Sequence, residues 1–184
     1  MVDTDTQTEP FSNRVIALDT LPTFEGGALE AISPRYRVIN VSLSVAITLI
    51  LVAIFTLIRW QPLVDVPSPL LLSYPYACMV VAVLGGLGAL YHVFADVKIK
   101  YALREQDLCL QKGLIFRQLA CQPILRVQHV ETKRGPLTRL AGLASLQVFS
   151  AGGEYHTFEI PGLPVARAEQ LRQFILNHKD VSAK

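Results

Sequence analysis

The stretch VINVSLSVAITLILVAIFTLI, from Val38 to Ile58, runs for 21 residues without a charged side chain. A helix rises about 1.5 Å per residue, so a helix of this length crosses a hydrocarbon layer about 30 Å thick. Charged residues make up only 17% of the whole chain, whereas about a quarter of the residues in an average soluble domain are charged. The stretch therefore predicts a transmembrane helix.

A second apolar run follows, LLLSYPYACMVVAVLGGLGALYHVFA from Leu70 to Ala95, and its 26 residues are enough to cross a membrane with tilt. Pro75 lies near its start, where a missing N–H costs a helix least. The connection RWQPLVDVPSP is short and carries three prolines. Residues 35–95 therefore predict an antiparallel transmembrane hairpin, with helices at 38–58 and 70–95.

The charges around this hairpin differ between its two ends. The turn at residues 59–69 holds one basic and one acidic residue, Arg59 and Asp65. The basic residues at the other end are Arg35, Arg37, Lys98, Lys100 and Arg104. Because Lys and Arg collect on the cytoplasmic side, both termini are expected in the cytoplasm. The aromatic residues typical of membrane interfaces are Trp60 and Tyr74 near the turn and Tyr36 and Tyr91 at the opposite end.

Two pairs of small residues lie in the second helix, Ala82 with Gly86 and Gly85 with Ala89. Small residues at this spacing let another helix approach closely, so they predict a packing face. The first helix of the hairpin is the nearest partner for this face. A contact with a second copy of the chain is the alternative.

The first 34 residues lack the basic start and early apolar stretch of a cleavable signal peptide, and we expect a disordered cytoplasmic tail at 1–34. Residues 1–37 carry six acidic and three basic side chains, whereas residues 96–184 carry thirteen basic and eight acidic ones. The basic part suits an anionic lipid surface or an acidic partner, and an ordinary basic surface explains it equally well.

From Val97 the pattern changes to the alternation of a half-buried strand. Turn residues then divide the sequence into about six or seven short strands, with turns at REQD (104–107), at Lys112-Gly113 and, last, at Gly152-Gly153. Residues 96–178 predict an antiparallel β domain with its own core, able to fold without the hairpin, followed by a tail at 179–184. The apolar stripe of its C-terminal helix comprises Val165, Ala168, Leu171, Phe174 and Ile175.

The chain has three cysteines, Cys78, Cys109 and Cys121, and no C-x-x-C pair. This odd number and spacing argue against a disulfide framework or a zinc site. We expect all three side chains to be small apolar fillers in a reducing compartment.

Several motifs of the β domain resemble the second class of bacterial PH domains. The most specific are RVQHV at 126–130, the run from Gly135-Pro136-Leu137 to Leu146, and IPGL at 160–163. With the two preceding helices, residues 36–177 resemble YdbS-type PH domain-containing membrane proteins. The resemblance implies an α+β fold, in which a PH-like antiparallel β-barrel with a C-terminal helix follows the hairpin, and a multi-pass protein of the bacterial inner membrane. It implies no catalytic residue.

No catalytic, cofactor or metal site is expected, and no nucleic-acid partner. The sequence holds no H-E-x-x-H motif, and Ser150 in FSAGG does not match the G-x-S-x-G turn of hydrolases. The histidines are scattered over different predicted elements, at His92, His129, His156 and His178. We therefore expect the chain not to be an enzyme, although a membrane-anchored enzyme is a third hypothesis.

The stretch RGPLTRLAGLASLQVFSAGG, residues 134–153, is interpreted as a corner between two strands. Its apolar residues Leu137, Leu140 and Leu143 are expected to plug one end of the barrel. The densest basic cluster lies beside it, and the candidate contacts with lipid or partner are Lys98, Lys100, Lys133, Arg134 and Arg139.

Two functions remain open. One is a membrane-anchored PH-like interaction module that assembles with other inner-membrane proteins, a second PH-domain protein among them. The other is an anionic-lipid sensor that uses the basic corner. Specific inositol-lipid recognition is not expected, because Lys100 and Arg104 in the first hairpin are diluted by Glu105 and Asp107.

Overall fold

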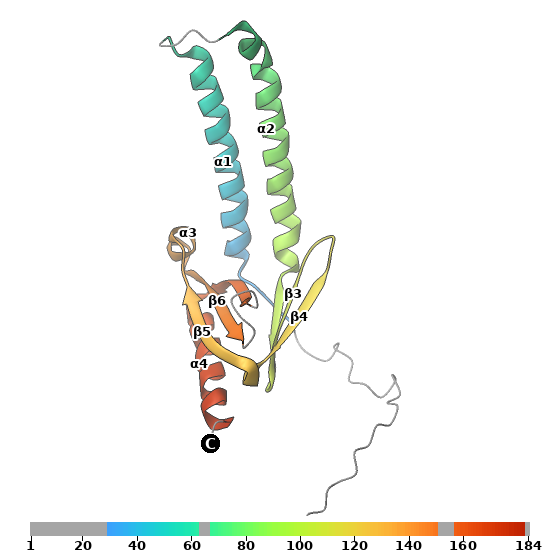
Figure 1. The fold of residues 1–184 in the computed structure, drawn as a ribbon, viewed down its shortest axis with the longest axis vertical. Helices are drawn as coiled ribbons and strands as arrows, with labels where there is room; N and C mark the ends of the chain where they lie inside the picture. The colour runs from blue at the N-terminus through green and yellow to red at the C-terminus, as the bar shows by residue number, and fades with distance from the viewer. Residues whose placement is uncertain (1–28, 63–66, 151–156, 183–184) are drawn as a thin grey trace, which may run out of the picture.

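Two long helices stand side by side above a small domain of two sheets and a C-terminal helix (Figure 1). The computed structural model describes residues 29–62, 67–150 and 157–182. The predictions for Gly152-Gly153, for His156 and for residues 1–28 of the tail concern residues outside these ranges.

The two helices are α1, Pro34–Trp60, and α2, Ser68–Ala95. Both extend a few residues beyond the predicted apolar runs because polar and proline residues serve as their first turns. The Oγ of Ser33 accepts the N–H of Arg35 at 3.4 Å and caps α1, while α2 begins at Ser68-Pro69. Within the described ranges these are the two helices long and apolar enough to cross a membrane, and neither has its apolar window buried in the protein.

The domain contains two antiparallel sheets. The first has the order β1-β2-β3-β4, with strands Glu30–Ala31, Lys100–Leu103, Asp107–Lys112 and Gln118–Pro123. The second has the order β5-β6-β7, with strands Val127–Lys133, Leu143–Ser150 and Thr157–Pro164. The short helices are η3 (Asp96–Lys98), η4 (Ile124–Arg126) and α3 (Pro136–Leu140), and the chain closes with α4 (Val165–Ser182).

The core lies between the two sheets and α4. Ala168, Leu171 and Ile175 on α4 are all at most 2% exposed, which confirms the predicted stripe. They pack in one cluster with residues of both sheets, including Leu108 and Ile160. The helix continues to Ser182, past the predicted domain end at residue 178.

The antiparallel strands and the C-terminal helix of the predicted PH-like barrel are present, but the described strands pair as two separate sheets and do not close into a barrel. The break falls between β4 and β5. Pro123 ends β4 without an N–H to donate, and the single turn of η4 then carries the chain into the other sheet. A register shift between Val127 and His129 disturbs the pairing of β5 with β6 just after this turn.

The predicted tail also needs correction at its end, because residues 30–32 belong to the domain. Glu30 and Ala31 form β1 and pair with Tyr101 and Lys100 of β2, and Ile32 is 7% exposed within the core. The hairpin of α1 and α2 is therefore inserted between two neighbouring strands of one sheet. A two-residue strand is too short for its alternation to be detected in the sequence.

Candidate functional site

One face of α2 packs tightly on α1. A Cβ added at Gly85 would lie 1.9 Å from the Oγ1 of Thr48, and one added at Gly88 would lie 3.2 Å from the Oγ of Ser44. The Ser44 hydroxyl also donates to the carbonyl oxygen of Gly85 at 3.3 Å. The close approach of the two helices therefore requires glycine at Gly85.

The predicted small-residue face divides into two. Gly85 packs on α1 and Ala89 is half-buried, whereas Ala82 and Gly86 are exposed. A Cβ added at Gly86 would meet no described atom within 4 Å. One pair thus includes the glycine that closes the intramolecular hairpin, and the other leaves an open small-residue face.

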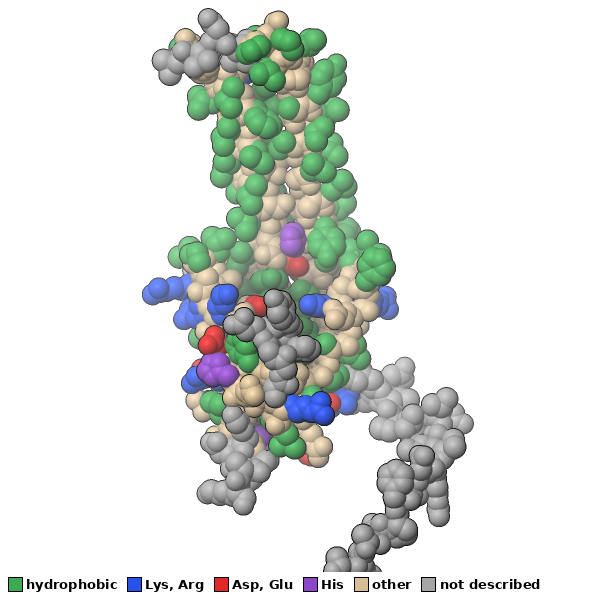
Figure 2. All heavy atoms as spheres, in the orientation of Figure 1, with side chains coloured by type: hydrophobic (Ala, Val, Ile, Leu, Met, Phe, Trp, Pro, Cys, Tyr) green, Lys and Arg blue, Asp and Glu red, His purple; other side chains and the backbone are tan. Residues whose placement is uncertain are grey.

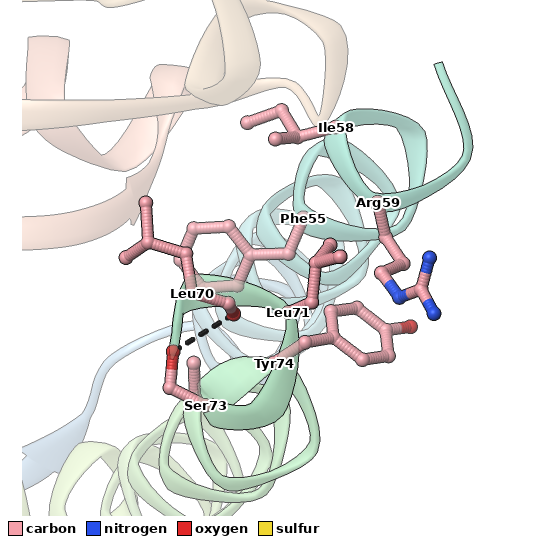
Figure 3. Close-up of a pocket in the computed structure, with 8 residues that line it drawn as sticks. Phe55, Ile58, Arg59, Leu70, Leu71, Ser73 and Tyr74 are labelled. Carbon is pink, nitrogen blue, oxygen red and sulfur yellow. Dashed lines mark hydrogen bonds between the residues drawn. The ribbon is translucent and has the colours of Figure 1, made fainter. Parts of the chain in front are cut away.

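The far end of the hairpin carries a groove of about 240 Å³ between the two helices. Phe55, Leu70 and Leu71 contribute its apolar wall, and Arg59 and Tyr74 lie at one side (Figure 3). The Thr56 and Tyr74 hydroxyls are 3.0 Å apart and link α1 to α2. Among the residues described there, the lining is mostly apolar and holds no carboxylate or histidine, as is common where a membrane helix meets the interface.

The near end of the hairpin is fixed to the domain by several contacts. Asp96, only 6% exposed, accepts a hydrogen bond from the Nδ2 of Asn40 at 2.8 Å and lies 3.4 Å from the Nδ1 of His92. Arg35 donates to the carbonyl oxygen of Ala141 at 3.4 Å, which joins the start of α1 to the end of α3. The helices and the domain therefore share a structured junction.

A further contact between α1 and the domain lies at Gly162, whose φ of +66° is in the left-handed region. A Cβ there would lie 2.6 Å from the Cγ of Tyr36. The residue thus meets two requirements that favour glycine, and Tyr36 of α1 packs directly on the backbone of β7.

A charged network attaches β1 to the rest of the domain. The Tyr101 hydroxyl donates to Glu30 at 2.6 Å, and Arg167 of α4 contacts the other oxygen of that carboxylate at 2.5 Å. Hydrogen bonds from Tyr101 and then Arg167 hold the pKa of Glu30 below its usual value. Burial, followed by the hydrogen bond to Glu30, raises the pKa of Tyr101. We assign this network a structural role.

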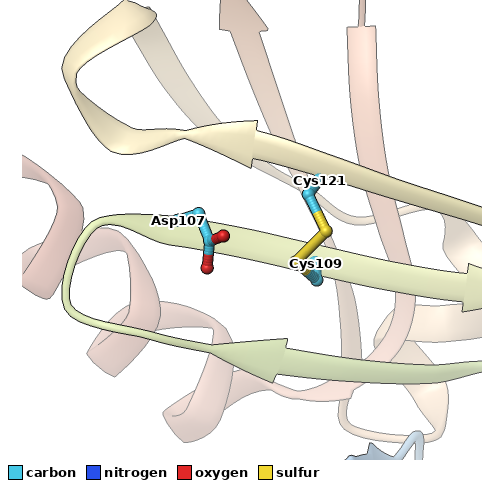
Figure 4. A group of neighbouring side chains, drawn as sticks. All are labelled: Asp107, Cys109 and Cys121. Atoms are coloured by element: carbon cyan, nitrogen blue, oxygen red, sulfur yellow. A yellow bond between two sulfur atoms is a disulfide. The ribbon is translucent and has the colours of Figure 1, made fainter. Parts of the chain in front are cut away.

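The prediction for two of the cysteines is wrong, because Cys109 and Cys121 form a disulfide. They lie directly opposite each other in β3 and β4 (Figure 4). The disulfide was not predicted because the cysteines are odd in number and lack a C-x-x-C pair, and a turn at Lys112-Gly113 would also have placed the two residues out of register. Lys112 still pairs with Gln118, so the turn spans residues 113–117 and the register moves by several residues. Cys78 is a free cysteine in α2.

The Asp107 carboxylate lies beside the disulfide, with the three potential ligand atoms within 4.8 Å of one another. A metal ion binds the thiolate form of cysteine, and here both sulfur atoms are bonded to each other. Asp107 Oδ1 lies 3.8 Å from the Nε of Arg104. This group is therefore not a metal-ligand set in the disulfide form.

The described histidines lie on separate elements, each with a local partner. On the exposed face of β5, the Nε2 of His129 lies 2.9 Å from the Oε1 of Glu131. The ring of His178 stacks on Phe174 of the same helix. His92 contacts Asp96, as described above. Ser150 lies at the end of β6. Among the described residues, none of these histidines forms a hydrogen-bonded pair with Ser150 or with another histidine.

The predicted basic contacts occupy two places. Lys98 and Lys100 lie immediately below α2, in η3 and β2, whereas Lys133, Arg134 and Arg139 flank or belong to α3. All five are exposed.

The predicted plug of the barrel end is wrong for two of its three leucines. Leu143 is 1% exposed, but Leu137 is 42% and Leu140 is 87% exposed. The reason is that α3 projects from the sheet beside the first turns of α1, and only Leu143 enters β6 and the core. The sequence did not single out a second exposed apolar pair, Ile115 and Phe116, in the β3–β4 turn. The turn was predicted at Lys112-Gly113, so these two residues were assigned to the following strand and not to an exposed turn.

The comparisons with known proteins agree with this architecture. The family model for the bacterial PH domain matches residues 21–179. The UPF0699 transmembrane protein YdbS of Bacillus subtilis (strain 168) is 31% identical over 94 residues, which cover 48% of this chain and 57% of that protein. The chain thus matches little more than half the length of this relative. No solved structure matches the chain. The two apolar helices and the transmembrane relative together support a membrane location.

Proposed function

The chain belongs to the bacterial PH domain family, and from this premise we propose that it is a non-enzymatic, membrane-anchored interaction module. Its hairpin places a PH-like domain at a membrane surface, and its partners are other proteins of the same membrane, a second PH-domain protein among them. Family membership concerns the fold, so the argument for this function depends on particular surfaces.

The open face at Ala82 and Gly86 is the observation that carries the proposal. In a membrane, lipid is as apolar as leucine, and helices associate where small residues allow close packing and backbone contact. Gly85 already supplies that contact within the hairpin. A second small-residue face, pointing away from α1, suits the helix of another membrane protein.

The proposed location is the bacterial inner membrane, with both termini and the domain in the cytoplasm. Arg35, Arg37 and Lys98 at the domain end of the hairpin support this orientation, because the turn end has only Arg59 and Asp65.

The test is co-purification of the full chain from native membranes in mild detergent. We expect the wild type to retain a membrane protein partner that Gly86→Leu loses. Val83→Leu is the matched control, since Val83 is 54% exposed on the same helix and the change adds only one methylene. If the wild type carries no protein partner, or if both variants retain it equally, the proposed interface is wrong.

Anionic-lipid sensing is the second candidate function. Lys133, Arg134 and Arg139 are exposed beside α3, and each basic residue near an anionic leaflet contributes about 1 kcal/mol. Native mass spectrometry of the full chain can count the anionic lipids that it retains. Replacing all three residues by Gln is expected to reduce that number without changing the retention of neutral lipids. An equal loss of both lipid classes contradicts sensing by charge.

A further inference from the structure

Two exposed apolar groups project from the domain. Ile115 and Phe116 in the β3–β4 turn are 79% and 89% exposed, and Leu137 and Leu140 on α3 are 42% and 87% exposed. We call these four residues the membrane shoulders. Apolar side chains gathered at such exposure mark interaction sites more often than ordinary surface.

Both shoulders lie against the domain ends of the membrane helices. Leu137 and Leu140 line one side of a groove of about 470 Å³, and α1 residues that include Val38 and Leu43 line the other. Phe116 shares a second hollow, of about 260 Å³, with Tyr91 of α2. Figure 1 shows α3 and the tip of the β3–β4 hairpin on opposite sides of the helical pair, both directed toward the helices.

The level of the shoulders coincides with the expected edge of the bilayer. The uncharged run of α1 begins at Val38, and its 21 residues match a hydrocarbon thickness of about 30 Å. Tyr91 lies one turn before the end of α2, where aromatic residues favour the interface. A residue that shares a groove with Val38 or Tyr91 is therefore at the depth of the headgroup and acyl boundary.

The charges beside the shoulders suit an anionic leaflet. Arg134 precedes Leu137, and Arg139 lies between Leu137 and Leu140 in the sequence. Lys112 and Arg117 lie on either side of Ile115 and Phe116, and all four basic residues are exposed. Figure 2 shows apolar side chains continuing from the helices onto both sides of the domain, with Lys and Arg side chains next to them. Apolar tips with basic neighbours are typical of segments that lie in a membrane interface.

Local backbone geometry keeps the tip of the β3–β4 turn in this position. Gly113 has a φ of +108°, and a Cβ there would lie 1.9 Å from the carbonyl oxygen of Phe116. The turn therefore closes over glycine and leaves the Ile115 and Phe116 side chains pointing outward. On the other side, Pro136 begins α3, and Gly142, with a φ of +69°, ends it before the chain enters the core at Leu143.

We propose that the membrane shoulders insert into the headgroup and acyl boundary of the leaflet nearest the domain, and that anionic phospholipid is their partner. The inference rests on the proposed membrane anchorage by α1 and α2. Insertion on both sides of the hairpin holds the domain upright, so that the far ends of its sheets and α4 face the aqueous phase.

Tryptophan fluorescence of the reconstituted full chain tests this arrangement. The chain has a single tryptophan, Trp60, so Trp60→Phe provides a silent background. One tryptophan is then introduced by Phe116→Trp, Leu140→Trp, Leu125→Trp or Ile47→Trp. Each variant is placed in vesicles of mixed neutral and anionic phospholipid, with and without lipid brominated near the headgroup end of its acyl chains or, for I47W, near their far end, because Ile47 lies nine residues beyond Val38 and so near the middle of the bilayer.

The control positions separate the two proposals. Leu125 is 68% exposed in η4, at the end of the sheets away from the helices, and Ile47 is 50% exposed in α1. We expect F116W, L140W and I47W to emit at shorter wavelength than L125W, because their indole rings lie in apolar surroundings. We expect brominated lipid to reduce the emission intensity of these three variants and to leave that of L125W unchanged.

Each other outcome overturns one of the two proposals. Quenching of I47W without F116W and L140W leaves the anchorage intact but rejects the shoulders, whose apolar residues then belong to a protein contact. Quenching of one shoulder alone, or of L125W as well, rejects the upright arrangement. No quenching of I47W rejects the membrane anchorage itself, and the shoulders with it.

Discussion

Leu171 lies on the buried face of α4 and is 2% exposed, so Leu171→Asp places an unpaired carboxylate in the core. We expect a loss of at least about 3 kcal/mol in the free energy of unfolding of the domain. Thermal unfolding followed by circular dichroism measures the change. Asn177→Asp on the exposed side of the same helix is the matched control and should leave the midpoint nearly unchanged. Equal stability of the two variants would show that α4 does not pack as described.

Glu30 has a lowered pKa, and this shift determines how its network depends on pH. A carboxylate whose pKa is lower in the folded state stabilises the protein above the unfolded pKa, and that contribution is lost as the pH falls through the folded pKa. The Glu30 and Arg167 side chains are 49% and 41% exposed, so the pair contributes only about 0.2–1 kcal/mol.

Glu30→Gln is therefore expected to lower the free energy of unfolding slightly at pH 7, with the difference from wild type disappearing on acidification below the pKa of the folded protein. Chemical unfolding of both proteins across the acidic range measures it. A difference that grows on acidification contradicts the assigned direction of the pKa shift.

Element by element, the long periodic segments were predictable from the sequence. The two helices of the hairpin have apolar runs of more than twenty residues and α4 has a stripe of eleven, and the structure has helices within a few residues of these positions. The short elements were not predictable in this way. Glu30–Ala31 acquires its strand only by pairing with β2, more than 60 residues later in the sequence, and the register of β3 with β4 depends on a turn whose length the glycine alone does not reveal.

The same limit applies to the candidate surfaces. The sequence identified Gly85 and Gly86 together, because both occur at helix-packing spacing. Which glycine faces α1 depends on the rotation of α2 about its own axis, and that rotation is set by contacts with Thr48 and Ser44 on the other helix. The exposure of Leu140 likewise depends on how α3 leaves the sheet, and apolar composition alone predicts burial.

The insertion of the hairpin between β1 and β2 changes the expectation for the isolated domain. A fragment of residues 96–182 lacks Ile32, whose burial contributes about 1.5–3 kcal/mol. Joining residues 29–33 through a flexible linker to residue 96 restores that strand without α1 and α2. We expect the joined protein to unfold at a temperature higher by at least about 4–8 °C, the change that about 1 kcal/mol produces in a domain of this size.

Calorimetry of the two fragments measures this difference. Ile32→Ser in the joined protein is the matched control, and it should bring the midpoint back toward that of the shorter fragment. Equal midpoints of the joined protein and the shorter fragment would mean that β1 contributes nothing to the stability of the domain.

At the scale of the whole molecule, two features point to different compartments. The basic residues around the domain end of the hairpin predict a cytoplasmic domain. The Cys109–Cys121 disulfide instead suits an oxidising compartment, because cytosolic reductants keep most thiols reduced. The two features are compatible if the pair exists as thiols in the growing cell and closes under oxidation, since β3 and β4 already hold the two residues opposite each other.

Cysteine labelling decides the orientation. In a background with Cys78, Cys109 and Cys121 replaced by Ala, one cysteine is introduced by Ser68→Cys at the turn end or by Gln118→Cys at the exposed start of β4. Gln118 is preferable to Leu110 in β3, which is only 3% exposed. A membrane-impermeant maleimide is expected to label S68C in intact cells and Q118C only after permeabilisation. The reverse pattern would place the domain outside the cytoplasm, make the disulfide its permanent state, and reject the orientation predicted from the Lys and Arg residues.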